Sequence, residues 1–280
     1  MDLGRAIKAP LKDPEWPLKL GAGIGSGWLL LSLMGFLRSS PVLFFVMAMP
    51  LLCGTQVEYI FNVGTGGEVL PSLGSFGKKC IDGFMVGFAV FVYTLPITIL
   101  FAIMLLPALL AAVSSGDTSN VAGALAGSGC VFLLIAPVYC LVFSVFFPAA
   151  LTNYAMDRRF GALFAIGEIL RLINGGTGYW AAWGYLLLIG VTSGIVAILP
   201  GVLLGSIAKL PGMELIAASA QLVSAYIGSL VLWIGFYLTL MAQGHMLGQW
   251  AAKAFNATIF EGMPPAAPMH PPTSPYAGRW

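Results

Sequence analysis

The sequence predicts an all-α integral membrane protein in which six transmembrane helices form a bundle. Composition is the first observation: 59% of the 280 residues are hydrophobic and 9% are charged, whereas soluble globular chains carry about 25% charged residues. The second is the length of the apolar runs, several of which exceed the roughly 20 residues that a helix needs to cross a bilayer. The third is an asymmetry of positive charge between alternate connections.

Three regions follow from these patterns: a cytoplasmic N-terminal segment (1–17), a transmembrane domain (18–255) and a cytoplasmic tail (256–280). Apolar runs between charged and turn residues predict spans at Leu18–Leu37, Pro41–Asn62, Asp82–Val113, Val121–Tyr154, Tyr179–Leu210 and Glu214–Gln243. Several of these are longer than the bilayer requires, so we expect tilting or bending. The candidate kinks are Pro96, Pro107, Pro137, Pro148 and Pro200.

Positive charge predicts the orientation. Of the 13 lysines and arginines, all but Arg38 and Lys209 lie in the first 19 residues, in the 64–81 and 155–178 connections or in the C-terminal region. The positive-inside rule places these parts in the cytoplasm. We therefore expect a multi-pass protein of the bacterial cytoplasmic (inner) membrane with both termini in the cytoplasm.

The two long cytoplasmic connections resemble each other, and both are expected to be amphipathic. Tyr59 and Gly83 are 24 residues apart, as are Tyr154 and Gly178. The spacing is compatible with a parallel repeat of two units, and chance similarity between membrane segments is the equal alternative.

Arginines alternate with apolar side chains in the 158–173 segment, which predicts an amphipathic helix on the cytoplasmic face. Arg158, Arg159 and Arg171 would lie at the lipid interface, near anionic headgroups. A connector that lies on the membrane without a further role is the alternative.

Small residues recur at four-residue spacing, a pattern that lets helix backbones approach closely in lipid. It predicts helix packing at Gly21, Gly25, Gly83, Gly87, Gly123, Gly127, Gly190, Gly194, Gly244 and Gly248.

The tail is rich in proline, which favours polyproline II structure suited to docking on a partner. The candidate docking residues are Pro265, Pro268, Pro271, Pro272, Pro275, Tyr276 and Trp280. A disordered tail is the alternative.

Ionisable side chains are nearly absent from the centres of the predicted spans, which disfavours ion-coupled transport. His245 lies one helical turn from Gln249, and a membrane histidine can ligate haem or chlorophyll. A hydrogen bond from His245 to a cytoplasmic connection is the favoured alternative, so no cofactor is expected. No metal-ligand spacing or catalytic motif occurs, and the net charge of +2 gives no indication of nucleic-acid binding.

Short motifs along residues 10–255 resemble a bacterial and archaeal family of multi-pass membrane proteins, domain-of-unknown-function family four thousand and thirteen. They are Asp13-Pro14-Glu15-Trp16 with Lys19 and Gly21, Leu70-Pro71, Asp82-Gly83, Asn153-Tyr154-Ala155 with Phe160 and Phe164, and His245 with Gly248-Gln249. The chain departs from that pattern at Ser72-Leu73 and in its tail. The family has no established activity, so the resemblance implies a topology and no catalytic residues.

These observations lead us to expect a non-enzymatic accessory or scaffold subunit of a larger bacterial membrane complex, of photosynthetic, respiratory or secretion type. Its partners would be membrane lipids and other membrane subunits. The alternative is a transporter or channel for a small neutral or amphipathic solute, with a path near Thr94, Ser144 and Tyr226. A third reading is a lipid-associated organiser that uses the 158–173 segment.

Overall fold

The computed structural model describes residues 1–19, 21–22, 25, 41–67, 69–71, 74–115, 118–175, 178–207 and 234–255. All regular structure in these residues is helical. The order is α1 (Leu3–Lys8), the 3-10 helix η1 (Ala9–Leu11), α3 (Pro41–Gly64), α4 (Phe76–Ser115), α5 (Thr118–Asp157), the 3-10 helix η2 (Phe160–Phe164), α6 (Ile166–Asn174) and α7 (Tyr179–Ile207). Residues 234–255 form a further helix, the 234–255 helix.

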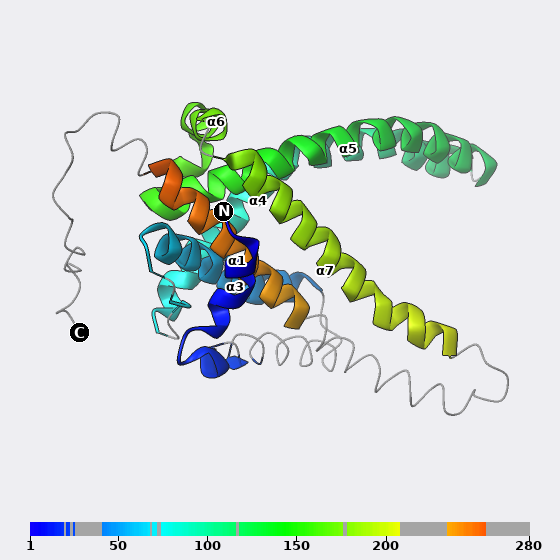
Figure 1. The fold of residues 1–280 in the computed structure, drawn as a ribbon. Coiled ribbons are helices and arrows are strands. Elements are labelled where there is room, and N and C mark those ends of the chain that lie inside the picture. Colours follow the sequence, from blue (N-terminus) through cyan, green and yellow to red (C-terminus); the bar gives the residue numbers. More distant parts are fainter. Residues whose placement is uncertain are drawn as a thin grey trace.

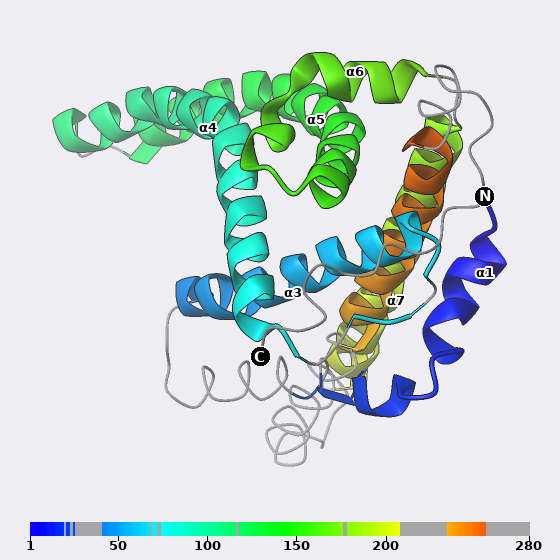
Figure 2. The same cartoon turned by 90° about the vertical axis from the view of Figure 1, so that its left-hand side faces the viewer.

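The long helices diverge from a shared core (Figures 1 and 2). There α3, the beginnings of α4 and α7, the end of α5 and the 234–255 helix meet, and the core includes Ile60, Ala150, Tyr154, Leu163 and Trp250. Beyond it, α4 and α5 continue side by side as a long hairpin, while α7 projects in another direction (Figures 1 and 2). The core is therefore at one end of the long helices.

Helices that follow each other along the chain pair in opposite directions. A Cβ on Gly54 would meet Lys79 and one on Gly83 would meet Pro50, so α3 and α4 contact each other in reverse order. Between α4 and α5 the ring pairs are Tyr93–Phe143 and Phe101–Phe132, again in reverse order. Helices that cross the same layer one after another along the chain must alternate in direction in this way.

The 234–255 helix lies between α3 and α7. Against α7 it pairs in reverse order, through Tyr179–Trp250 and Ser193–Thr239. Against α3 it pairs in the same order, because Gly244 lies beside Tyr59 and Gly248 beside Val63. In a chain whose helices cross one layer in turn, an odd number of crossings lies between two parallel helices, and in the described part of the chain these are α4, α5 and α7.

The helix boundaries follow the hydropathy pattern with informative differences. α3 and α7 begin at Pro41 and Tyr179, as predicted. α4 begins at Phe76 rather than Asp82, and the 234–255 helix continues past the predicted end at Gln243. An ion pair explains the earlier beginning of α4, because Lys79 Nζ lies 3.3 Å from Glu58 Oε2 of α3. A hydropathy pattern places a helix boundary at such a charge, but here the charge is paired within the packed helices.

The two connections differ from each other, and the second is not the single helix predicted over 158–173. In the first, the described residues 65–67, 69–71 and 74–75 are not helical. The second contains η2 and α6, which are separated at Ala165 (φ −75°, ψ 70°), and Arg158 ends α5 with a positive φ of 61°. α6 is amphipathic as predicted: Ile169, Leu172 and Ile173 are buried on one face, while Ile166 and Leu170 are exposed.

Two stretches, Phe76–Pro107 and Val131–Asp157, are long and apolar enough to cross a membrane, and Tyr179–Ile195 is a shorter apolar helix. Only 6% and 0% of the most apolar window in the two long stretches is buried. The core helix of a soluble protein would be covered by its neighbours, so the exposed apolar surface of these two helices points to association with a membrane or with another apolar surface. The predicted spans Leu18–Leu37 and Glu214–Gln243 lie largely outside the described residues.

Candidate functional site

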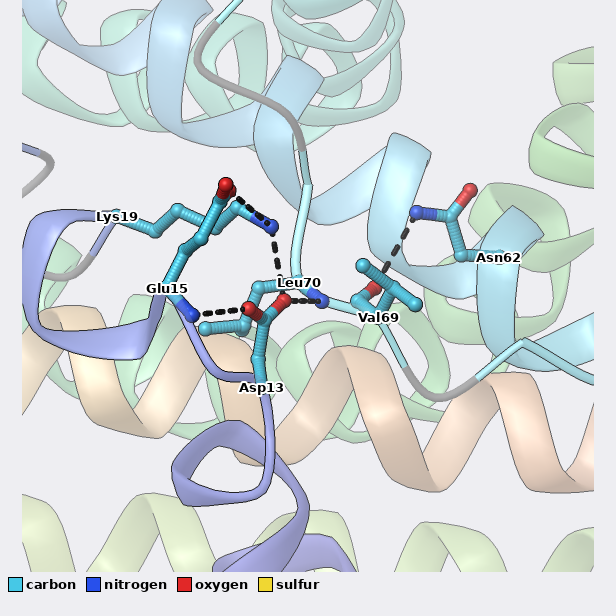
Figure 3. Close-up of polar contacts among 6 residues, drawn as sticks. All are labelled: Asp13, Glu15, Lys19, Asn62, Val69 and Leu70. Carbon is cyan, nitrogen blue, oxygen red and sulfur yellow. Dashed lines mark hydrogen bonds and ion pairs between the residues drawn. The ribbon is translucent and has the colours of Figure 1, made fainter.

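Asp13 fastens the N-terminal segment to the connection that follows α3 (Figure 3). One carboxylate oxygen, Oδ1, accepts the backbone N–H of Glu15 at 2.8 Å. The other, Oδ2, accepts Lys19 Nζ at 2.8 Å and the backbone N–H of Leu70 at 3.0 Å. On the far side of the connection, Asn62 Nδ2 of α3 donates to the carbonyl of Val69 at 3.3 Å. The connection is thereby held from both sides.

Burial and hydrogen bonding act on the Asp13 carboxyl in opposite directions. Burial raises its pKa, because Asp13 is only 5% exposed. The hydrogen bonds from Lys19, Glu15 and Leu70 lower it, and together they outweigh burial, so the pKa of Asp13 lies below its ordinary value. Asp13 is therefore ionised at neutral pH.

A second polar cluster joins α4 to α5. Tyr154 Oη donates to Asp82 Oδ1 at 2.8 Å, and Arg158 Nη1 donates to Asp82 Oδ2 at 2.7 Å. The Arg158 guanidinium also lies 4.9 Å from the ring centre of Phe61 on α3. Both oxygens of Asp82 are used, so this carboxylate serves to hold the three helices together at the core.

His245 lies in a third cluster, with Gln249 and the backbone of Asp2. Gln249 Oε1 accepts the N–H of Asp2 at 2.9 Å, and Gln249 Nε2 donates to the Asp2 carbonyl at 3.1 Å. This two-point pairing permits one orientation of the amide, which leaves Nε2 facing His245 Nδ1 at 2.9 Å. His245 Nδ1 is therefore an acceptor, and the proton of the neutral imidazole is on Nε2.

The tautomer bears on the haem or chlorophyll prediction for His245. A histidine that ligates a metal through Nε2 donates its Nδ1–H to a carboxylate or carbonyl. Here Nδ1 faces an N–H donor, so Nε2 carries the proton instead of a free lone pair. His245 in this arrangement does not fit a metal ligand. In the part of the chain that the structure describes, no group of three or more His, Cys, Asp or Glu side chains is placed to hold a metal ion.

A cavity of about 490 Å³ lies beside this cluster, between α1, the end of α3 and the 234–255 helix. It is lined by Met1, Asp2, Arg5, Val63, Gly66, His245, Gln249, Ala252 and Lys253. Arg5 and Lys253 bring positive charge to it from distant parts of the sequence. No local pattern predicts this cavity, because its walls come from three separate segments.

The predicted packing glycines fall into different environments. Added Cβ atoms would lie 1.6 Å from the Pro50 carbonyl oxygen at Gly83, 2.5 Å from Val63 Cβ at Gly248 and 3.3 Å from the Tyr59 ring at Gly244. At Gly190 the nearest atom is Gln243 Nε2, at 3.8 Å. Among the described residues, nothing lies within 4 Å of such an atom at Gly21, Gly25, Gly87 or Gly194. Gly123 and Gly127 are helical, but their surroundings lie outside the described part.

Two of the three predicted lipid-facing arginines are in ion pairs. Arg158 pairs with Asp82, and Arg159 Nε lies 2.8 Å from Asp157 Oδ2. Arg159 nevertheless has a side chain that is 78% exposed, and Arg171 is exposed in the last turn of α6. The predicted docking residues Pro265, Pro268, Pro271, Pro272, Pro275, Tyr276 and Trp280 lie outside the described residues.

Two of the side chains named for a polar path, Thr94 and Ser144, bond within their own helices. Thr94 donates to the Phe91 carbonyl at 3.0 Å and Ser144 to the Leu141 carbonyl at 2.8 Å. Thr239 of the 234–255 helix bonds to Ser193 of α7. Tyr226 lies outside the described residues. These contacts give the hydroxyls structural partners.

The comparisons with known proteins agree with the resemblance carried by the short motifs. No curated protein and no solved structure matches the chain. The model of one family, described as "Protein of unknown function (DUF4013)", matches residues 39–205, which is more than half of the chain. The motif residues Asp82 and Tyr154 within that range contact each other directly. The chain belongs to the DUF4013 family.

Proposed function

We propose that this protein is a multi-pass membrane protein with six crossings and both termini in the cytoplasm, acting as a non-enzymatic accessory or scaffold subunit of a larger complex in the bacterial inner membrane. The observation that carries the proposal is the exposure of apolar side chains along the α4–α5 hairpin. Ile103 and Leu110 of α4 are 61% and 60% exposed, and Leu133 and Leu134 of α5 are 70% and 74% exposed. Such a surface needs lipid or another apolar helix against it.

The distribution of polar contacts supports the orientation. The Asp82 and His245 clusters adjoin the core, because Tyr154 and Met246 belong to it, and Asp13 binds the connection that follows α3 (Figure 3). Positively charged connections lie at the core end of the long helices, which the positive-inside rule assigns to the cytoplasm. The alternating direction of successive helices is also what serial crossings require.

Divergence of the long helices supports a scaffold role. Away from the core, the α4–α5 hairpin and α7 project in different directions (Figure 2). Val191 and Ile195 of α7 are 61% and 58% exposed. In lipid, helix association depends on van der Waals packing, and helices that leave faces uncovered can pack against those of another subunit.

The experiment is extraction of the full chain from native membranes into lipid nanodiscs, followed by native mass spectrometry and cross-linking. We expect particles heavier than one protomer, with cross-links from the exposed faces of α4, α5 or α7 to other membrane proteins. A homogeneous monomer without cross-linked partners contradicts the scaffold role. Recovery of the chain in the soluble fraction contradicts the membrane location.

A further inference from the structure

The cavity beside the 234–255 helix has the volume of a small-molecule site, and two positively charged side chains line it. Its volume of about 490 Å³ falls within the roughly 300–1,000 Å³ typical of small-molecule sites. Arg5 lines it from α1 and Lys253 from the end of the 234–255 helix. Asp2 is the acidic residue among the lining residues, and its Oδ1 accepts the N–H of Arg5 at 2.9 Å as the N-cap of α1. The ionised lining side chains therefore carry a net positive charge.

The outer surface of α1 and η1 continues this charge and adds apolar side chains. Lys8 and Lys12 are exposed, and Ile7 and Leu11 are 57% and 53% exposed beside them. The opposite side packs inward, with Ala6 and Ala9 fully buried. Cations interspersed with exposed apolar side chains are typical of segments that lie on an anionic lipid surface.

We propose that the cavity binds the phosphate group of an anionic phospholipid, held by Arg5 and Lys253, while α1 lies along the neighbouring headgroups. The inference rests on the proposed membrane location. α3 ends at Gly64 beside the cavity, and the lining residues His245 to Lys253 belong to the last turns described for the 234–255 helix. Helix ends lie at headgroup level when the apolar parts of the helices cross the bilayer.

The test measures lipid retained by the full chain. The delipidated protein in mild detergent is titrated with phosphatidylglycerol or phosphatidylcholine, and bound lipid is counted by native mass spectrometry. We expect wild type to retain phosphatidylglycerol preferentially. The double variant Arg5→Gln/Lys253→Gln should bind it about 25-fold more weakly, because each cation near an anionic surface contributes about a fivefold factor.

The control is Lys78→Gln, which removes one positive charge from an exposed position at the beginning of α4, outside the cavity lining, and is compared with the single variant Lys253→Gln. We expect it to retain phosphatidylglycerol as wild type does. Equal retention by wild type and the cavity variant overturns the proposal, and so does a loss confined to the control. Should the double variant fail to fold, Lys253→Gln alone, at an exposed position, should weaken retention about fivefold.

A second arm separates lipid from free phosphate. Inorganic phosphate at millimolar concentration should leave the thermal midpoint of wild type unchanged. An increase with phosphate, absent in the cavity variant and accompanied by no preference for phosphatidylglycerol, assigns the cavity to a soluble anion and overturns the lipid proposal. Because retention is measured on protein already extracted from membranes, a negative result leaves the membrane location standing.

Discussion

At the scale of single residues, buried polar side chains hold segments together that are far apart in the sequence. Asp13 and Leu70 are separated by 57 positions, and Tyr154 and Asp82 by 72. In each pair a carboxylate accepts hydrogen bonds that no neighbour along the chain could supply. The cost of burying these carboxylates is offset because each oxygen has a donor within hydrogen-bond distance.

Replacing Asp13 tests this description. Asp13→Asn keeps the shape but offers one acceptor oxygen to three donors, so we expect a loss of about 2–3 kcal/mol in the free energy of unfolding. Glu15→Gln is the control, because the Glu15 side chain is 67% exposed and should matter by less than about 1 kcal/mol. The measurement is thermal unfolding of the purified protein in nanodiscs.

The lowered pKa of Asp13 also predicts how stability depends on pH. The folded state holds the carboxyl ionised to a lower pH than the unfolded chain does, so it binds fewer protons. The contribution of Asp13 is present above about pH 4, the ordinary aspartate pKa, and is lost as the pH falls through the folded pKa. Wild type should approach Asp13→Asn in stability on the acid side, and a constant difference from pH 7 to pH 2 would contradict this.

His245 supplies a prediction about proton position. Nitrogen NMR of the labelled protein should show an unprotonated Nδ1 and a protonated Nε2 at neutral pH, since Gln249 Nε2 faces Nδ1. In Gln249→Glu the carboxylate can only accept hydrogen bonds, so the proton of the His245 ring should move from Nε2 to Nδ1. An Nδ1-protonated wild type would restore His245 as a candidate metal ligand.

At the scale of elements, the contact between α3 and α4 depends on two glycines. A Cβ would lie 1.9 Å from the Lys79 carbonyl oxygen at Gly54 and 1.6 Å from the Pro50 carbonyl oxygen at Gly83. These obstacles are backbone atoms, which a rotamer change cannot move. The two helices therefore approach as closely as their main chains allow.

Gly83→Ala should accordingly force α3 and α4 apart and cost about 3 kcal/mol or more. Gly87→Ala is a closely matched control, one turn further along the same helix, where nothing lies within 4 Å of the added Cβ. It should change stability little. Fluorescence-detected size exclusion after heating compares the two, and equal thermal midpoints would contradict the close contact.

Hydropathy predicts where the helices lie better than it predicts the structure of the connections between them. The apolar runs located the beginnings of α3 and α7, since helix-forming apolar stretches are a local property. The predicted helix over 158–173 missed the separation of η2 from α6 at Ala165, because η2 is held by contacts with other helices, such as the hydrogen bond from Tyr93 Oη of α4 to the Leu163 carbonyl at 2.6 Å. For the same reason the sequence indicated His245 and Gln249 as neighbours on one helix, but could not predict that Asp2 completes their cluster.

At the scale of the whole molecule, the long helices present apolar side chains to the surroundings over most of their length. Leu134, near the middle of α5, is 74% exposed, and Phe76, at the beginning of α4, is 63% exposed. If α5 crosses a bilayer, these positions lie at different depths although both are exposed. If both helices lay in water, the two positions would have the same surroundings.

Arginine substitutions distinguish the two surroundings. Leu134→Arg should reduce membrane insertion by about 2.5–3.5 kcal/mol, because it places a charge near the centre of the bilayer. Phe76→Arg, at the predicted interface, should insert normally. The fraction of each variant that resists carbonate extraction is the measurement. Equal tolerance of both arginines would indicate that α5 lies in water.

The parallel contact between α3 and the 234–255 helix has a consequence for biosynthesis. Gly248 lies against Val63, although 185 residues separate them in the sequence. At translation rates of roughly 5–20 residues per second, α3 leaves the ribosome about ten to forty seconds before its neighbour exists. During that interval the nascent chain holds an unfinished surface at Ile60 and Val63, where a chaperone or insertase could bind and where premature release would lead to misfolding.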